Sequence, residues 1–195
     1  MKRILSSILL ISCLTTAADA QIVKSYDRPS EKEFKTAVKQ VLQKTSCFDK
    51  DLSRRLESVN VIQREFNNFN VADWKAFDKC QDSEQIAEME SKGTPYFYRM
   101  AFDKVLKEVK STKVAEGKVV LWNVYNMGYV VKTPAHTFGI DIVQKHLDQL
   151  APELDFLLVT HNHGDHNNAH ARNQLALAEV KTYAGFKLAQ PHEYQ

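Results

Sequence analysis

The sequence predicts an α+β protein in which a helical N-terminal region, residues 21–112, precedes a region of strands and helices, residues 117–195. Up to position 112, apolar side chains recur at helical spacing, whereas later residues form short runs of β-branched and aromatic side chains. All six glycines stand at or after Gly93, and all seven histidines stand at or after His136. The two parts of the chain therefore differ in composition as well as in periodicity.

Residues 1–20 have the pattern of a secretory signal peptide. Two basic residues precede a largely apolar run over residues 4–11, and residues 18–20 (Ala-Asp-Ala) match a cleavage pattern. This run is much shorter than the roughly 20 residues of a membrane-spanning helix. We therefore expect no stable membrane span, cleavage near Ala20, and a secreted or periplasmic protein. Cys13 leaves a lipoprotein signal as the alternative.

The helical region predicts four amphipathic helices. Ser30 and Glu33 form a capping box at the start of the first. Thr94 is the expected N-cap of the fourth, with Pro95 at its first helical position. The apolar stripes are best interpreted as a packed helical core. Their members are Phe34, Val38, Val41 and Leu42; Leu52, Leu56, Val59 and Phe66; Trp74 and Phe77; and Phe97, Ala101, Val105 and Val109.

The second region predicts a sheet with two or more helices. Three successive strands separated by turns are followed by a short helix that Pro152 ends, then by a buried strand, a helix and a last short strand. In that order, the expected elements cover residues 119–125, 129–132, 137–142, 144–150, 154–159, 167–178 and 180–183.

Charge and cysteine content restrict the partners. The chain has 26 Lys and Arg against 24 Asp and Glu, a formal net charge of +2. This balance lacks the basic surface that nucleic-acid binding needs, so we expect a small-molecule substrate and no nucleic acid. Cys47 and Cys80 would remain after signal cleavage, in a compartment where disulfides persist. A Cys47–Cys80 disulfide and two separate thiols both remain open.

A cluster of metal-ligand side chains follows the predicted strand at residues 154–159. His161 and His163 are two residues apart, Gly164 permits a bend, and Asp165 and His166 follow at once. Imidazoles and a carboxylate are ligands that suit Zn²⁺, and they also accept Mn or Fe. An accidental histidine-rich loop or a structural metal site is the alternative, but the order H-x-H-x-D-H between a strand and a helix favours catalysis.

This motif resembles the signature of the metallo-β-lactamase superfamily, which matches Thr160 to His166 at every defining position. Asp141, which closes Gly139-Ile140-Asp141, resembles the acidic residue with which that family supports its metal loop without binding the metal. The resemblance covers residues 117–195.

The resemblance implies a hydrolase with two metal ions, most readily Zn²⁺. His161 and His163 would hold the first ion, and Asp165 and His166 the second. A hydroxide between the ions would attack the substrate, with Asp165 as the catalytic residue that orients it. The implied substrates are an ester, thioester, lactone, lactam or phosphodiester. His136, His146, His170 and His192 match no ligand position of the family, and they are interpreted as ordinary turn, helix or surface residues.

The resemblance also implies a four-layer αβ/βα sandwich, of which these residues would supply the first half. The family's later ligands, which are a third histidine for the first ion, a bridging aspartate, and a further histidine for the second ion, have no match here. We therefore expect this chain to be an incomplete copy of a longer protein. Two other functions stay open, namely a noncatalytic metal-binding or scaffold protein of the envelope, and an interaction module in which residues 21–112 make the contacts.

Overall fold

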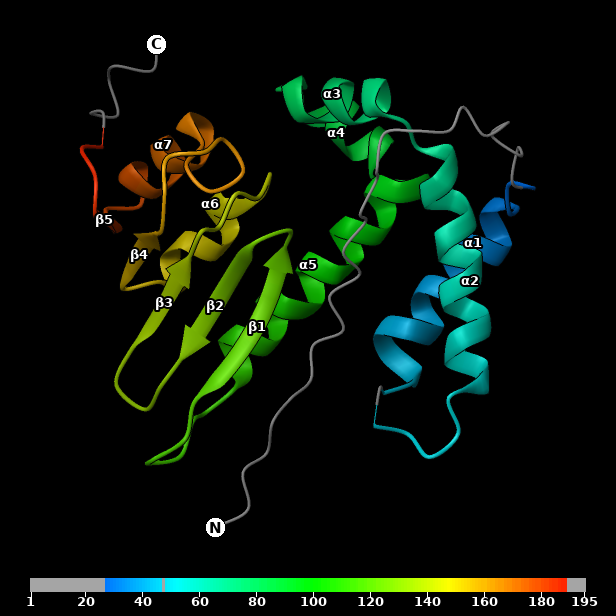
Figure 1. Cartoon of the computed structure of the whole chain (residues 1–195), viewed down its shortest axis with the longest axis horizontal. Coiled ribbons are helices and arrows are strands. Elements are labelled where there is room, and N and C mark those ends of the chain that lie inside the picture. The colour runs from blue at the N-terminus through cyan, green and yellow to red at the C-terminus, as the bar shows by residue number, and fades with distance from the viewer. Residues whose placement is uncertain (1–26, 47, 189–195) are drawn as a thin grey trace, which may run out of the picture.

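Figure 1 shows the computed structural model, which describes residues 27–46 and 48–188. Within these residues the chain has seven α-helices and one five-stranded mixed sheet, so the predicted α+β class is confirmed. The expected signal peptide, residues 1–20, lies outside the described residues. Cys47 lies outside them as well, and the proposed disulfide with Cys80 stays a prediction. None of the described helices is both long and apolar enough to cross a membrane.

Five α-helices precede the sheet, one more than the sequence predicted. The capping box at the first helix is confirmed, because Glu33 N donates to Ser30 Oγ at 3.3 Å and Ser30 N donates to Glu33 Oε2 at 2.8 Å. The additional helix is α4, which Asp82 caps by accepting a hydrogen bond from Gln85 N. The helices are α1 (Glu31–Lys39), continued by a π-helical turn (Gln40–Lys44), α2 (Ser53–Asn68), α3 (Val71–Lys79), α4 (Ser83–Met89) and α5 (Gly93–Ser111).

The predicted N-cap of α5 is wrong. The helix begins at Gly93 and its N-cap is Lys92, so Thr94 lies inside the first turn. Gly93 has a φ of +58°, which costs glycine little, and this conformation lets the chain turn into the helix before Thr94. The Thr94 side chain is buried, and its Oγ1 has no hydrogen-bond partner among the described residues.

The sheet has the order β1-β2-β3-β4-β5, which is also the order along the chain. The first three strands pair antiparallel, whereas β3 with β4 and β4 with β5 pair parallel. Each parallel connection carries a helix, as such crossovers require. The elements are β1 (Val120–Tyr125), β2 (Gly128–Lys132), β3 (Thr137–Ile140), α6 (Leu147–Leu150), a 3₁₀ turn (Ala151–Glu153), β4 (Phe156–Val159), α7 (Ala169–Leu177) and β5 (Lys181–Ala184).

Several expected elements are shorter than predicted, including the third strand and the helix after it. The strand predicted over residues 137–142 ends at Ile140, because Asp141 has a φ of +50° and leaves the extended conformation. The helix predicted over residues 144–150 is regular only from Leu147. The first difference places the Asp141 carboxylate where it accepts hydrogen bonds from Thr160, at the start of the histidine-rich loop.

Helix α5 contributes to two hydrophobic cores. Near its start, Tyr96 and Phe97 pack on the core that α1 and α2 form around Phe34 and Val38. Further along, Phe102 and Val109 are fully buried in the core that the sheet forms with α6 and α7. In Figure 1, α5 accordingly lies between the α1–α2 pair and the sheet. The sequence predicted that the helical region ends at residue 112 and the sheet region begins at residue 117. Helix α5 belongs to the first region by sequence, but it also packs against the sheet of the second.

Candidate metal centre

The candidate site lies at the edge of the sheet where β1, β3, β4 and β5, which run in the same direction, have their carboxyl ends. β1 ends in Tyr125, Asp141 directly follows β3, and Thr160 directly follows β4 and begins the loop at residues 160–166. Because β1, β3 and β4 run in the same direction, their carboxyl ends meet at this edge. Such an edge is where sheets of this kind hold their functional side chains.

Asp141 holds the first residue of the loop in place through hydrogen bonds. Its side chain is buried, with 4% of the residue exposed, and it accepts hydrogen bonds from Thr160 N at 2.8 Å and Thr160 Oγ1 at 2.7 Å. Its own backbone N donates to Leu158 O at 2.9 Å. Burial by itself would raise the pKa of Asp141, but the hydrogen bonds from Thr160 and the nearby His166 hold this pKa below its ordinary value. The carboxylate is therefore charged at neutral pH.

The backbone of Asp141 is strained. Its φ of +50° lies in the left-handed region of backbone conformation. This conformation costs a residue other than glycine on the order of 1–3 kcal/mol. Such strain persists only where surrounding contacts fix the conformation, as the bonds to Thr160 and Leu158 do here. Asp141 is hydrogen-bonded to the start of the loop. The family resemblance predicts a supporting carboxylate at this residue, and its role toward a metal stays a prediction.

His166 lies between two carboxylates. Its Nδ1 is 2.9 Å from Asp141 Oδ2, and its Nε2 is 3.6 Å from Asp165 Oδ2. The Nδ1 contact is short enough for an ion pair but is not aligned as a hydrogen bond. A carboxylate beside Nδ1 favours a proton on that nitrogen, which leaves the lone pair on Nε2. Nδ1 has the closer of the two carboxylates, so we expect the proton on Nδ1 and the lone pair of His166 on the Nε2 that faces Asp165.

The ring of His161 lies between those of His163 and His166. The centroid distances are 4.7 Å to His163 and 3.8 Å to His166. His161 Nδ1 is 3.0 Å from Thr160 Oγ1, whose only proton is donated to Asp141. Nδ1 must then be the donor in that contact, and the lone pair of His161 resides on Nε2. The backbone at residues 161–163 is bent, whereas the sequence predicted an extended backbone. The rings of His161 and His163 nevertheless contact each other, as predicted for side chains on the same face.

Backbone hydrogen bonds close the loop into a turn. His166 N and Asn167 N both donate to His163 O, at 2.9 and 2.6 Å, and Asn168 then caps α7 through a bond from Ala171 N. Gly164 does not use a positive φ, and a Cβ placed on it would meet no atom within 4 Å. The bend that the sequence attributed to Gly164 therefore requires no glycine.

The four predicted ligands suit a metal by type but do not enclose one in this conformation. Among the described residues, no group of three or more His, Cys, Asp or Glu side chains is arranged to hold an ion. His161, His163 and Asp165 are exposed, so they can change rotamer at small cost. Three imidazoles and a carboxylate are a donor set for Zn²⁺, and the lone pairs assigned to two Nε2 atoms agree with it. The donor types therefore suit a metal, and metal binding by these residues stays a prediction.

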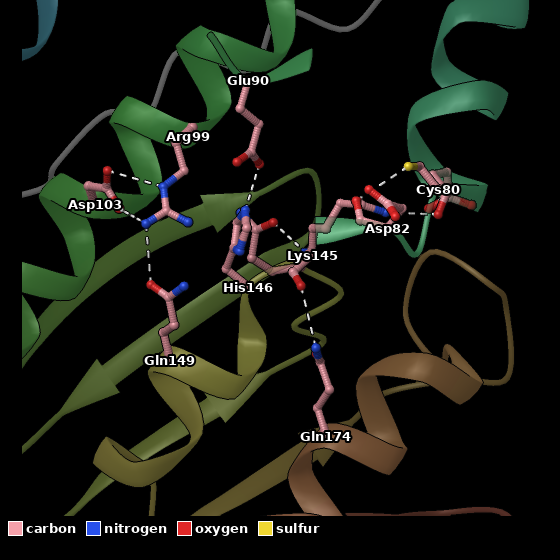
Figure 2. A network of polar contacts seen from close by, with 11 residues as sticks. Cys80, Asp82, Glu90, Arg99, Asp103, Lys145, His146, Gln149 and Gln174 are labelled. Atoms are coloured by element: carbon pink, nitrogen blue, oxygen red, sulfur yellow. Dashed lines mark hydrogen bonds and ion pairs between the residues drawn. The ribbon is translucent and has the colours of Figure 1, made fainter. Parts of the chain in front are cut away.

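The remaining described histidines lie away from this loop. His136 pairs with Asp155 on the surface, at 3.2 Å, and His170 is exposed in α7. His146 is not an ordinary surface residue, because its Nε2 lies 2.6 Å from Glu90 Oε1 and only 17% of its side chain is exposed. Figure 2 shows this pair between the end of α4 and the segment before α6. His192 lies outside the described residues.

Three aromatic residues near the loop were missed as functional candidates. Tyr125 lies close enough to Asp165 that burial, Asp78 and Asp165 together raise its pKa. Its ring contacts Tyr98 and Trp74, which the sequence places in different helices. The only signal in the sequence was that Tyr125 is the last residue of a predicted strand, a position close to those of Asp141 and Thr160 in their own strands.

Comparison of the chain with protein-family models, curated proteins and solved structures gave no match.

Proposed function

We propose that the chain carries a metal-dependent hydrolase site of the metallo-β-lactamase type at residues 160–166. One observation supports this most strongly: the rings of His161 and His166 lie 3.8 Å apart, and Nδ1 of each ring faces an oxygen, Thr160 Oγ1 at 3.0 Å for His161 and Asp141 Oδ2 at 2.9 Å for His166. Imidazoles whose Nδ1 is held by a neighbouring acceptor are typical of metal sites.

Each residue would have a distinct task. His161 and His163 would hold one ion, and Asp165 and His166 a second. Asp165, half of whose side chain is exposed, would also accept a hydrogen bond from the attacking water and orient it. Asp141 would keep Nδ1 of His166 protonated without touching the metal.

Bound divalent cations would supply a water acidic enough to attack at neutral pH and would polarise the oxygen of the group under attack. The chain itself would position the water through Asp165 and the substrate through the walls beside the loop. An ester, thioester, lactone, lactam or phosphodiester all present such an oxygen, and these are the proposed substrate classes.

The proposal extends to fold and location. The sheet, with α5, α6 and α7 in one common core, would be one half of a four-layer αβ/βα sandwich. Residues 1–20 would direct the protein to the periplasm or outside the cell. Noncatalytic metal binding is the second candidate, because the described loop offers four donors and a structural zinc site uses about four.

Metal content and zinc affinity of the purified protein test the first step. We expect zinc to bind the full chain, and His161→Ala, His163→Ala and His166→Ala each to weaken binding by more than about tenfold. His170→Ala is the matched control, since this exposed histidine lies only four residues beyond the motif. Equal zinc affinity in all four variants and the parent would remove the metal proposal.

Hydrolysis assays on the five substrate classes test the second step. We expect turnover by the zinc-loaded protein, and its loss in Asp165→Asn even at saturating zinc. Zinc binding without turnover of any class would contradict catalysis and support the noncatalytic candidate.

A further inference from the structure

A cavity of about 640 Å³ opens beside the candidate metal loop. Residues of α3, α5, the end of β1, the segment before α6 and the start of α7 form its walls. Its volume is in the range of small-molecule sites, which is roughly 300–1,000 Å³. The α7 wall includes Asn168 and Ala169, two and three residues after His166, and the charge of Asp165 helps to raise the pKa of Tyr125 in the β1 wall. A molecule in the cavity would therefore lie next to the proposed reaction centre.

One wall of the cavity is aromatic. Trp74, Tyr98 and Tyr125 come from three different elements, yet their ring centroids lie 5.0 to 6.0 Å apart. All three side chains are partly exposed, so part of each ring is available to a ligand. Rings that line a cavity in this way bind flat apolar groups by stacking and edge contacts.

The same wall offers two unused hydrogen-bond donors. No hydrogen bond to another described residue engages the hydroxyl of Tyr98 or Tyr125. Burial raises the pKa of Tyr98 to about 12, and burial with nearby carboxylates raises that of Tyr125, so both hydroxyls keep their protons at neutral pH. Both can therefore donate to an acceptor on the ligand.

The cavity also has cationic side chains. Lys145 Nζ donates to Asp78 O at 3.0 Å, lies 5.1 Å from the ring centroid of Phe77, and forms no ion pair among the described residues. Gln174 Nε2 fixes the backbone of Lys145 by donating to its carbonyl at 3.4 Å, as Figure 2 shows. Lys75 and Lys79 also line the cavity, where Asp78 is the one carboxylate among the described lining residues, and Glu90 acts on Lys145 from outside this lining. This excess of positive charge favours an anion.

We propose that this cavity binds a small flat aromatic molecule that carries a carboxylate. The ring would pack against Trp74 and Tyr98, and the carboxylate would take Lys145 as its partner. We further assign this group as the part of the substrate that the proposed hydrolase recognises beside the bond it cleaves. That assignment rests on the proposed function, whereas the binding itself does not.

Calorimetric titration of the full chain with 1-naphthylacetate, in EDTA to remove any metal, tests the binding. We expect this acid to bind more than about tenfold more tightly than 1-naphthylacetamide, because a charge-assisted hydrogen bond is stronger than a neutral one. Lys145→Gln should abolish this preference while leaving the amide affinity unchanged. Equal affinities of acid and amide for the parent protein would overturn the assignment of an anion site.

Aromatic variants locate the site. Trp74→Ala should weaken both probes by about tenfold or more, and Trp74→Phe should restore most of the loss. Tyr183→Ala is the matched control, because Tyr183 is an exposed aromatic residue of β5 that does not line the cavity. Probe affinity that is unaffected by Trp74→Ala, in a protein whose circular dichroism is unchanged, would overturn the cavity assignment.

The two proposals fail separately. His161→Ala should leave naphthylacetate binding in EDTA intact even though it removes a proposed zinc ligand. Zinc binding without naphthylacetate binding would contradict only the cavity, and naphthylacetate binding without zinc binding would contradict only the metal centre.

Discussion

His146 Nε2 lies 2.6 Å from Glu90 Oε1, and this pair connects the segment before α6 to the end of α4. Only 17% of the His146 side chain and 9% of the Glu90 side chain are exposed. Arg99 adds a second link by donating to Gln149 at 3.3 Å (Figure 2). The helical region and the sheet region are therefore joined by polar contacts as well as by α5.

Replacing His146 should measurably destabilise the protein. His146→Ala leaves the buried Glu90 carboxylate without its partner, which we expect to lower the free energy of unfolding by about 1–3 kcal/mol. Urea denaturation measures this change. His136→Ala is the control, because His136 also pairs with a carboxylate but is 63% exposed, and its loss should cost less than about 0.5 kcal/mol. If His146→Ala and His136→Ala lowered the free energy of unfolding equally, the pair of His146 with Glu90 would contribute no more to stability than an exposed pair.

Asp141→Asn should weaken zinc binding without removing a ligand. The amide cannot supply the charge that keeps Nδ1 of His166 protonated, so we expect zinc affinity to fall by about 10–100-fold. Asp155→Asn is the control, because Asp155 also accepts a backbone hydrogen bond, from Thr137 N at 2.9 Å, but stands before β4 rather than after β3. Zinc titration of both variants should show a loss for the first alone.

Two glycines should respond oppositely to alanine. Gly93 has a positive φ, and an added Cβ would lie 2.9 Å from Glu65 Oε1, so we expect Gly93→Ala to destabilise the protein by more than about 1 kcal/mol. Gly164 has neither constraint, and Gly164→Ala should be neutral or stabilising by up to about 1 kcal/mol. Thermal unfolding of the two variants ranks them. A large loss in Gly164→Ala would mean that the loop has another conformation in solution.

Glu108 should make part of the stability depend on pH. Burial raises the pKa of Glu108, but hydrogen bonds from Lys104 and Trp122 outweigh it and hold this pKa below the ordinary value. A carboxyl whose pKa is lower in the folded state stabilises the fold above its unfolded pKa, about 4.3, and this contribution is lost as the pH falls through the folded value.

The variant Glu108→Gln isolates this effect. We expect the difference in urea midpoint between parent and variant to be largest near neutral pH and to shrink toward about pH 3. Trp122 fluorescence reports the transition locally, since Trp122 Nε1 donates to Glu108 Oε2 at 2.9 Å. A difference that stays constant with pH would exclude a shifted pKa for Glu108.

Local signals predicted the secondary structure well. The Ser30 and Glu33 pair marked the start of α1, and runs of β-branched residues marked β1 and β2, because these features depend on neighbours in sequence. Thr94 was mistaken for a cap because its residue type and Pro95 fit the pattern, whereas the φ of Gly93 decided where the helix began. The end of β3 also escaped prediction, since the conformation of Asp141 depends on bonds to Thr160 and Leu158.

The candidate site was predictable only in part. The histidines and Asp165 are contiguous in sequence, so their clustering followed directly from the motif. Trp74 was interpreted as a core residue of a short helix, and Lys145 was not singled out. Their meeting at one cavity depends on how α3 and the segment before α6 pack, which no local pattern specifies.

Helix α5 spans 19 residues, a length of about 28 Å, with Gly and Pro only in its first turn. It places Tyr98 at the cavity and Val109 in the core beneath the sheet, so a single rigid rod spans the distance between them. Bending such a rod would break main-chain hydrogen bonds. The Tyr98 ring, the part of the aromatic wall that α5 carries, is consequently positioned before any molecule binds, so the entropy cost of ordering it is met during folding rather than during binding. Even a ligand with few atoms could then be retained.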